Sequence, residues 1–225
     1  MSRSLFTSRD GGVSSPPYES FNLATHVGDD FSSVRENRKT LASNFRLPVE
    51  NLFFMNQVHG REVAIIDENS DPADVPTVDA LFTQRRDVGL VTLIADCIPL
   101  LLHSDKAVAA VHVGRQGLVK GVVEATLAVF ESHGISPGEI QAELGPSICG
   151  RCYEVDGAMY NEVTGQIPAT ASQNSCLNIE AGLISLLDKS GVVWSSPGKC
   201  TAHDQGYFSY RRDGITGRQA GVISL

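Results

Sequence analysis

The sequence predicts an α/β domain in which helices cover a mixed β-sheet. The centre of the chain holds short apolar runs of strand length, several of them continuous in the way that is typical of strands buried on both faces. The period of the apolar residues then changes over residues 118–131 to that of a helix with one buried side. Strands followed by an amphipathic helix favour layers of helix on sheet.

The predicted elements follow one another along the chain in a definite order. A modest amphipathic helix over residues 33–45 comes first. The central strands are predicted at residues 52–55, 62–66, 80–83, 89–95, 99–103 and 107–113. After the helix at 118–131, which Gly134 is expected to end, the pattern predicts a strand at 140–144 and a helix at 178–189. Residues 207–211 and 220–225 are predicted as closing strands.

Composition limits the classes of function. With 225 residues, 42% of them hydrophobic, the chain fits one compact domain over residues 1–225. A net charge of −8 argues against nucleic acid as a partner and favours a small-molecule substrate. No signal pattern and no apolar stretch of the ~20 residues that a membrane helix needs are seen, and five cysteines fit a reducing compartment, so we expect the cytoplasm and no membrane partner. The oligomeric state is left open.

Three residues that bind borderline or soft metals each end an apolar, strand-like run. They are His59, Cys97 and His112, at separations of 38 and 15 positions, which match no short zinc-finger spacing. We therefore expect three adjacent strands to end at one place. Three ligands leave a tetrahedral zinc ion one open position, which is the arrangement of a catalytic metal, so all three are also candidate catalytic residues.

Two neighbouring features carry further hypotheses. Asp96 directly precedes Cys97 and is a catalytic candidate as the acceptor that orients a ligand histidine, although strand alternation points the two side chains to opposite faces. The segment from Gly114 to Gly117 opens the helix after His112, and Arg115 or the helix start at Gly117 is a candidate phosphate site. The alternative is that both glycines only allow a tight strand-to-helix turn.

Two loops further along the chain have a less specific composition. Cys149 and Cys152 form a Cys-x-x-Cys pair, which we interpret as packing of a substrate loop, because an all-cysteine zinc site with Cys176 and Cys200 would lack a second short spacing. The segment 207–218 combines aromatic residues with three arginines and can stack a base and hold an anion, with Arg211 and Arg218 as candidate contacts. An arginine–aspartate pair in a hairpin turn is the alternative.

Several motifs together resemble one known family. They are Arg9-x-Gly11-Gly12-Val13-Ser14, Gly28-Asp29-Asp30, Glu36-Asn37-Arg38, Asn56-Gln57-Val58-His59-Gly60, Asp79-Ala80, Ala95-Asp96-Cys97-x-Pro99, Ala110-Val111-His112, Gly145-Pro146-Ser147-Ile148, Cys152-Tyr153-Glu154-Val155 and Tyr210-Arg211-Arg212-Asp213-Gly214-x-Thr216-Gly217-Arg218. In this order the sequence resembles the YfiH family of laccase-domain purine nucleoside phosphorylases.

The resemblance implies a four-layer α/β/β/α fold, similar to a bacterial toxin deamidase, and a zinc site at His59, Cys97 and His112. It also implies phosphorolysis of inosine, adenosine and methylthioadenosine, deamination of adenosine, and nucleoside and phosphate as partners. Gln57, inside one of the motifs, is a further candidate for substrate contact.

The chain departs from the family pattern beside two of the expected ligands. Ile94 stands where the family usually has threonine, and Val113-Gly114-Arg115-Gln116-Gly117 stands where it has Ala-Gly-Trp-Arg-Gly. The change removes a tryptophan that would form a large part of a pocket wall and places the arginine one position earlier.

Three other functions compete with a zinc phosphorylase. A multicopper oxidase, the older label of the family, is excluded because the chain has six histidines and no His-x-His pair, although a single copper ion fits the same donors. A second alternative uses Cys97 as the nucleophile of a Cys-His hydrolase or amidase that edits peptidoglycan precursors. The third is a metal-binding protein without catalytic activity.

Overall fold

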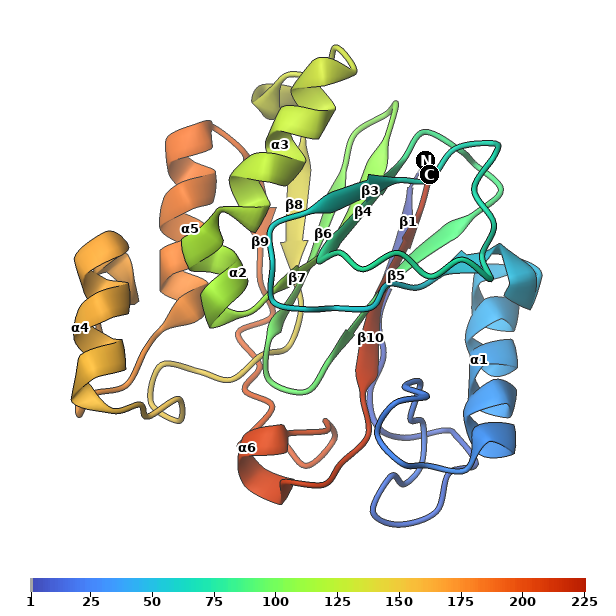
Figure 1. Ribbon diagram of the computed structural model, residues 1–225, viewed down its shortest axis with the longest axis horizontal. Helices are drawn as coiled ribbons and strands as arrows, with labels where there is room; N and C mark the ends of the chain where they lie inside the picture. Colours follow the sequence, from blue (N-terminus) through green and yellow to red (C-terminus); the bar gives the residue numbers. More distant parts are fainter. Residues whose placement is uncertain (1) are drawn as a thin grey trace.

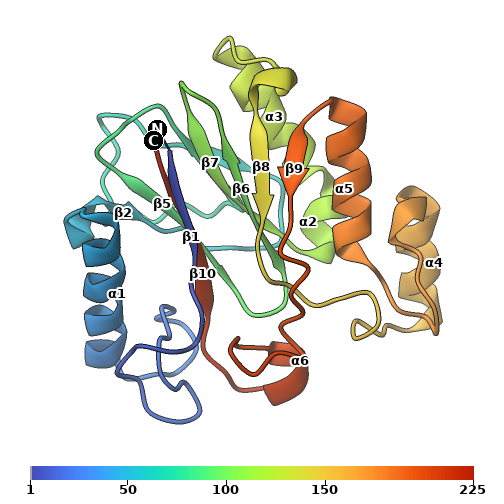
Figure 2. The same cartoon turned by 180° about the vertical axis from the view of Figure 1, so that it is seen from behind.

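Two β-sheets packed face to face form the centre of the protein, and helices cover both outer faces (Figures 1 and 2). The computed structural model describes residues 2–225. The four-stranded sheet has the order β1 (Arg3–Phe6), β10 (Gln219–Ser224), β5 (Gly89–Ile94) and β2 (Leu52–Phe53). β10 is antiparallel to both of its neighbours, and β2 is parallel to β5, so the sheet is mixed.

The six-stranded sheet has the order β3 (Val63–Ile65), β4 (Ala80–Thr83), β7 (Val108–Val113), β6 (Ile98–His103), β8 (Gln141–Leu144) and β9 (Val193–Ser195). The outer pairs β3–β4 and β8–β9 are parallel, and the three central pairings are antiparallel. The predicted mixed sheet is thus confirmed, as two sheets rather than one.

Helices lie on opposite sides of the paired sheets. α1 (Phe31–Phe45) flanks the four-stranded sheet, whereas α2 (Arg115–Lys120), α3 (Val122–Ser132) and α5 (Ile179–Ser190) flank the six-stranded sheet (Figure 1). The remaining helices are α4 (Gly157–Gln166), α6 (Tyr210–Asp213) and the short 3₁₀ helices Val49–Asn51, Pro137–Glu139 and Pro168–Thr170.

Three separate hydrophobic clusters fill the three spaces between these four layers. Leu101 of β6 and Leu90 of β5 meet between the sheets. Leu100 and Leu102, the neighbours of Leu101, point the other way and pack with Phe130 of α3. Because successive side chains of a strand alternate between faces, strands with a helix layer on one side and a second sheet on the other are apolar at every position. The four-layer α/β/β/α arrangement is confirmed. It explains the continuous apolar runs of the sequence, because both faces of these strands are covered.

The predicted helix over residues 118–131 is interrupted. Gly121 adopts φ +86, ends α2 and begins α3, so the chain changes direction in the middle of the apolar pattern. Glycine reaches this left-handed conformation without the steric cost that a Cβ would add.

The predicted strand over residues 207–211 is wrong. This segment contains the start of α6, and the side-chain oxygen of Ser209 accepts a hydrogen bond from the backbone N–H of Arg212. A serine at this position caps a helix start, and this cap outweighs the β propensity of the aromatic residues before it.

Besides α6 and the 3₁₀ helices, three elements were not predicted from the sequence. β1 and β9 are edge strands that are mostly exposed, and α4 buries only Val163 fully, so none has a strong apolar period. Among the described residues, none of the helices has the length and apolar composition required to span a lipid bilayer.

Candidate metal centre and substrate cavity

Cys97 lies where the chain crosses from one sheet to the other. Only residues 95–97 join the end of β5 in the four-stranded sheet to the start of β6 in the six-stranded sheet. Asp96 makes this sharp connection with φ +99. Its carboxylate accepts hydrogen bonds from the Thr201 and Ser209 hydroxyls and the Arg211 backbone N–H, each at 2.7 Å. The crossing is therefore fixed by contacts with the C-terminal segment.

One buried carboxylate, that of Asp79, holds the other two candidate ligands. It accepts hydrogen bonds from the backbone N–H groups of Val58, His59 and Gly60 at 3.1, 3.0 and 2.6 Å. These bonds fix the loop between β2 and β3, in which His59 has φ +55. The same carboxylate lies 2.7 Å from Nδ1 of His112 on β7. An Nδ1–H that donates to Asp79 leaves the lone pair on Nε2 of His112 for a metal.

The structure brings His59, Cys97 and His112 together. One donor atom from each lies within 4.8 Å of the other two, and Cys97 Sγ is 3.9 Å from His59 Nε2. A Cβ added to Gly114 would lie 2.9 Å from His59 Cδ2 and 3.0 Å from Cys97 Sγ. Glycine at this position thus leaves room for the imidazole and the thiol to meet.

The expected layout of these residues was only partly right. His112 lies within β7, but His59 is in a loop and Cys97 is in the link between the two sheets. The three residues do not end three adjacent strands. They meet because β5 and β7 are stacked in different layers, which no spacing along the sequence reveals.

The pKa values follow from this arrangement. Burial would raise the pKa of Cys97, but the charge of His112 and hydrogen bonds with both histidines lower it to about 6. Burial would lower the pKa of His112, but the Cys97 charge and the hydrogen bond to Asp79 raise it to about 9. Cys97 is therefore a thiolate at neutral pH, which is the form that binds metals.

The donor set fits a metal ion with an open coordination position. It consists of one thiolate and two imidazoles, Asp79 fixes the orientation of one imidazole, and His59 is exposed. Zinc takes these donors, and three protein ligands leave a fourth position for water or substrate.

A cavity of about 1000 Å³ opens beside the three residues, which are part of its wall. Phe54, Tyr153 and Tyr210 supply aromatic surface in this cavity. A cavity of this size, with apolar walls and a few polar groups, is typical of sites for small molecules.

Four arginines also line the cavity: Arg38, Arg115, Arg211 and Arg218. Within residues 2–225, none of them forms an ion pair with a carboxylate. The guanidinium of Arg38 lies 3.7 Å above the ring of Phe54, and burial lowers its pKa to about 10. Four guanidinium groups without carboxylate partners give the cavity a positive charge in a protein whose net charge is −8.

The candidate substrate residues have different surroundings. Arg115 lines the cavity, and its Nε is buried without a hydrogen-bond partner among the described residues. Arg211 donates to the Glu154 carbonyl at 2.9 Å and lies 5.3 Å from the ring centre of Tyr153. Arg218 donates to the carbonyls of Thr216 and Gly217. All three therefore face the same cavity, Arg211 and Arg218 with part of their hydrogen-bonding capacity already used and Arg115 with a buried Nε that has no partner.

Gln57 lines the cavity but its amide is used in structural contacts, and Gly117 has structural contacts only. The Gln57 amide donates to the Leu93 carbonyl and accepts from the Leu93 N–H, both at 2.8 Å, which ties the ligand loop to β5. Gly117 is the third residue of α2, not its first, and is not among the residues that line the cavity. A Cβ there would lie 3.3 Å from the Gly60 carbonyl, so the glycine serves close packing.

The hydrogen bonds of Asp96 also correct an expectation. The carboxylate bonded to a ligand histidine is that of Asp79, whereas Asp96 bonds the C-terminal segment. Sequence reasoning quoted Asp79 and Arg38 only as parts of motifs. Asp79 precedes an apolar strand and Arg38 lies in an amphipathic helix, so neither position has a local pattern that distinguishes it from a solvent-facing charge.

Comparison with known proteins places these features in a family. The family model described as "Multi-copper polyphenol oxidoreductase laccase" matches residues 3–225. A purine nucleoside phosphorylase of Corynebacterium glutamicum is 43% identical over 99% of this chain and 94% of its own length. The Escherichia coli purine nucleoside phosphorylase YfiH is 36% identical over 97% of this chain and 92% of its own length.

Solved structures agree with the sequence comparison. The Bacillus licheniformis hypothetical protein YfiH superimposes with a TM-score of 0.91 at 26% identity, over 100% of this chain and 92% of that protein. YlmD from Geobacillus stearothermophilus gives a TM-score of 0.88 at 28% identity, over 99% and 91% of the two chains. With the family model matching nearly all of its length, the chain belongs to the YfiH family, which carries the laccase-domain description.

Proposed function

We propose that this protein is a zinc-dependent purine nucleoside phosphorylase that cleaves inosine, adenosine and methylthioadenosine with phosphate. The observation that carries the proposal is the juxtaposition of two features. The three-residue donor set of His59, Cys97 and His112 opens into a cavity whose arginines have no carboxylate partners. Relatives of this chain over nearly its full length are named purine nucleoside phosphorylases.

The chain's own residues prepare the donor set. His59, Cys97 and His112 would hold the zinc ion, and Asp79 keeps both histidine segments in place through its four hydrogen bonds. A zinc ion bound there would supply a Lewis acid at an open position that can polarise an oxygen of phosphate or water.

The arginines suit the anionic substrate. Phosphate carries one to two negative charges at neutral pH, and guanidinium groups bind its oxygens through charge-assisted hydrogen bonds. Arg38 and Arg218 are partly buried, which strengthens such an interaction relative to an exposed pair. Phosphorolysis requires a phosphate oxygen at C1′ of the ribose, where it forms the new bond as the bond to the purine nitrogen breaks.

The aromatic residues of the cavity suit the purine. Phe54, Tyr153 and Tyr210 come from three distant parts of the chain and line the same space as the arginines. Aromatic rings stack on the faces of any purine base, so this surface fits several nucleosides. Adenosine deamination, in which water replaces the amino group at C6 and ammonia leaves, is part of the proposal because it uses the same purine pocket.

A first experiment compares the zinc-loaded wild type with Cys97→Ala in an inosine cleavage assay with and without phosphate. We expect the wild type to release hypoxanthine only when phosphate is present. In Cys97→Ala we expect kcat/KM to fall by more than about 100-fold and the protein to lose one zinc ion. Cys176→Ser is the matched control, because Cys176 is a buried thiol outside the donor set and its substitution should leave both readouts unchanged. Release of base without phosphate, or full activity in Cys97→Ala, would refute the proposal.

A cysteine hydrolase is the second candidate, and one observation favours it. Without a metal, the lowered pKa of Cys97 and the raised pKa of His112 describe a thiolate–imidazolium pair, which is the activated form of a cysteine nucleophile. Alkylation distinguishes the two functions, since a thiolate bound to zinc reacts slowly with iodoacetamide.

Protection of Cys97 by stoichiometric zinc, together with full activity of the protected protein, supports the phosphorylase. Activity that rises on removal of zinc supports the hydrolase. A zinc-loaded protein that neither cleaves nor deaminates any nucleoside supports a metal-binding protein without catalysis. The cytoplasm stays our predicted location for all three.

A further inference from the structure

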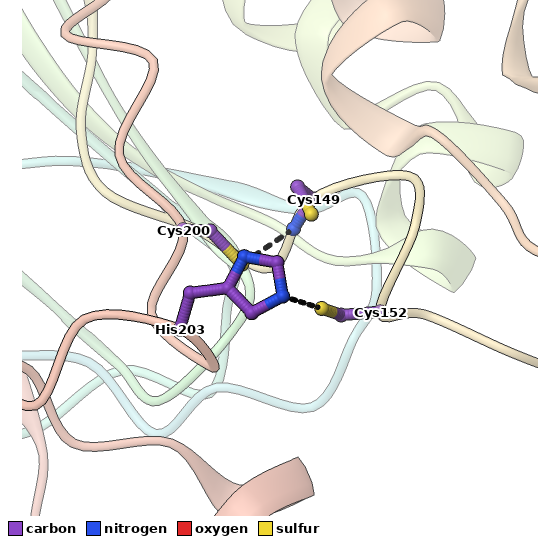
Figure 3. Close-up of side chains that lie close together, drawn as sticks. All are labelled: Cys149, Cys152, Cys200 and His203. Carbon is purple, nitrogen blue, oxygen red and sulfur yellow. Dashed lines mark hydrogen bonds between the residues drawn. The ribbon is translucent and has the colours of Figure 1, made fainter.

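Four metal-binding side chains gather at a second place in the molecule, outside the donor set described above. Cys149, Cys152, Cys200 and His203 each offer one donor atom, and the four atoms all lie within 4.8 Å of one another. Figure 3 shows the side chains of two loops converging, with the imidazole of His203 beside the Cys152 sulfur. Cys152 Sγ is 3.0 Å from His203 Nε2.

Each loop is a tight turn that presents two donors on one side. The N–H groups of Cys152 and Tyr153 donate to the Cys149 carbonyl at 3.0 and 3.2 Å. The N–H groups of His203 and Asp204 donate to the Cys200 carbonyl at 3.2 and 2.9 Å in the same way. Both segments therefore have the spacing ligand-x-x-ligand and the same backbone pattern, which brings the first and fourth side chains together.

Backbone contacts hold the two turns next to each other. Ser147 and Cys200 form a parallel bridge, with Ser147 N–H donating to the Lys199 carbonyl at 3.1 Å and Thr201 N–H donating to the Ser147 carbonyl at 3.0 Å. The Cys149 N–H also donates to Cys200 Sγ at 3.3 Å. The two turns are thus joined directly at one of the donor sulfurs.

We propose that Cys149, Cys152, Cys200 and His203 bind a structural zinc ion. Three thiolates and one imidazole form a closed tetrahedral set, and closed sets with short paired spacings are those of structural rather than catalytic zinc. Zn–S bonds of about 2.3 Å in a tetrahedron place the sulfurs about 3.8 Å apart, so the observed spread needs only a small contraction.

The remaining cysteine shows that the grouping is selective. Cys176 lies between Cys152 and Cys200 in the sequence and is buried. Its thiol donates to the Arg151 carbonyl at 3.6 Å and is not part of the cluster. The sequence analysis weighed only an all-cysteine zinc site for the Cys-x-x-Cys pair and left out His203. The short spacing from Cys200 to His203 was the available signal.

The position of the cluster indicates what this zinc does. One of its turns leads directly into Tyr153, and the other precedes Tyr210 and Arg211, all three of which line the substrate cavity. Arg211 also joins these two segments by donating to the Glu154 carbonyl. The ion would fix one wall of the cavity without contacting a substrate. This inference holds whether or not the proposed activity is correct.

Metal counting on the full-length protein tests the proposal. Purified under reducing conditions with zinc, the wild type should hold two zinc ions per chain by mass spectrometry. Cys97→Ala and His203→Ala should each hold one, and the double variant should hold none. Cys176→Ser, the matched cysteine control, should hold two. His203→Ala should also melt at a lower temperature than the wild type, with a difference that disappears after a chelator has removed zinc from both proteins.

X-ray absorption on Cys97→Ala provides a measurement that needs no change in the cluster itself. The single zinc ion of this variant should have three sulfur neighbours and one nitrogen neighbour. A zinc content that His203→Ala does not lower, an ion in Cys97→Ala without sulfur neighbours, or a disulfide among Cys149, Cys152 and Cys200 in the native protein would overturn the proposal. A wild type that holds two zinc ions but cleaves no nucleoside would instead count against the proposed function alone.

Discussion

Asp79 joins two ligand segments that are more than fifty residues apart. Its two carboxylate oxygens accept four hydrogen bonds, three from the His59 loop and one from the His112 ring. Burial would raise the pKa of this carboxyl group, but the hydrogen bonds from His112 and from the backbone of Gly60 and Val58 lower it to about 2. The group is therefore charged at every pH at which a histidine can bind a metal.

Replacing Asp79 by asparagine should weaken zinc binding at the first site. The amide group has only one accepting oxygen, so its NH₂ would face N–H donors of the His59 loop. Loss of a partner that orients a ligand histidine typically lowers metal affinity about 10- to 100-fold. Titration against a competing chelator measures the change, and urea denaturation of the zinc-free proteins separates it from a loss of folding.

Asp96→Asn is the matched control for this prediction. Asp96 is also a carboxylate beside the site with three hydrogen bonds, but none of them reaches a ligand histidine. We expect its zinc affinity to change by much less than that of Asp79→Asn. If both variants lost zinc affinity equally, the effect would come from a general disturbance of the site and not from the bond between Asp79 and His112.

At the scale of elements, the link between β5 and β6 and the start of α2 both position site residues. The link places Cys97 between the sheets, and α2 begins directly after β7, with its first residue, Arg115, on the cavity wall; the helix then ends at Gly121. The sequence pattern predicted both strands and the helical period. It could not predict the break, because the apolar residues continue across Gly121.

Two glycine-to-alanine substitutions should have opposite effects on stability. Gly121→Ala puts a Cβ on a residue with φ +86 and should cost about 1 to 2 kcal/mol of unfolding free energy. Gly165→Ala lies in α4 with open space around the added atom and should gain about 0.5 to 1 kcal/mol, since alanine loses less backbone entropy in a helix. Urea denaturation measures both, and a loss in both variants would contradict the assigned backbone conformations.

At the scale of the whole molecule, the stack of two sheets explains both the apolar sequence and the buried charge. Asp79 is fully buried between Val78, which belongs to the cluster between the two sheets, and Ala80 of β4, which belongs to the cluster under the helices of the six-stranded sheet. A carboxylate buried in this position contributes to folding only while it is charged and bonded.

The fall of the unfolding free energy at acid pH should therefore depend on Asp79. Its pKa is about 2 in the folded protein against an ordinary value of 3.8, so its contribution is fully present above about pH 4 and is lost as the pH falls through about 2. The shift corresponds to about 2 kcal/mol. Unfolding free energies of the zinc-free wild type and Asp79→Asn, measured from pH 6 to pH 2, should converge by about this amount. Asp10 is exposed, so the unfolding free energy of Asp10→Asn should change with pH in the same way as that of the wild type. The same pH dependence in Asp79→Asn and the wild type would refute the assignment.

The sequence by itself determined the strand and helix pattern of the centre, the mixed α/β class and the residue types His59, Cys97 and His112, because periodicity and side-chain chemistry are local properties of the chain. Only the tertiary structure decided which residues meet. Stacking of the two sheets brought β5 and β7 into contact, gave Asp79 its partners and gathered four arginines around one cavity. It also joined the turn at Cys149 to the turn at Cys200, since convergence of distant segments depends on strand order and register, which no single segment encodes.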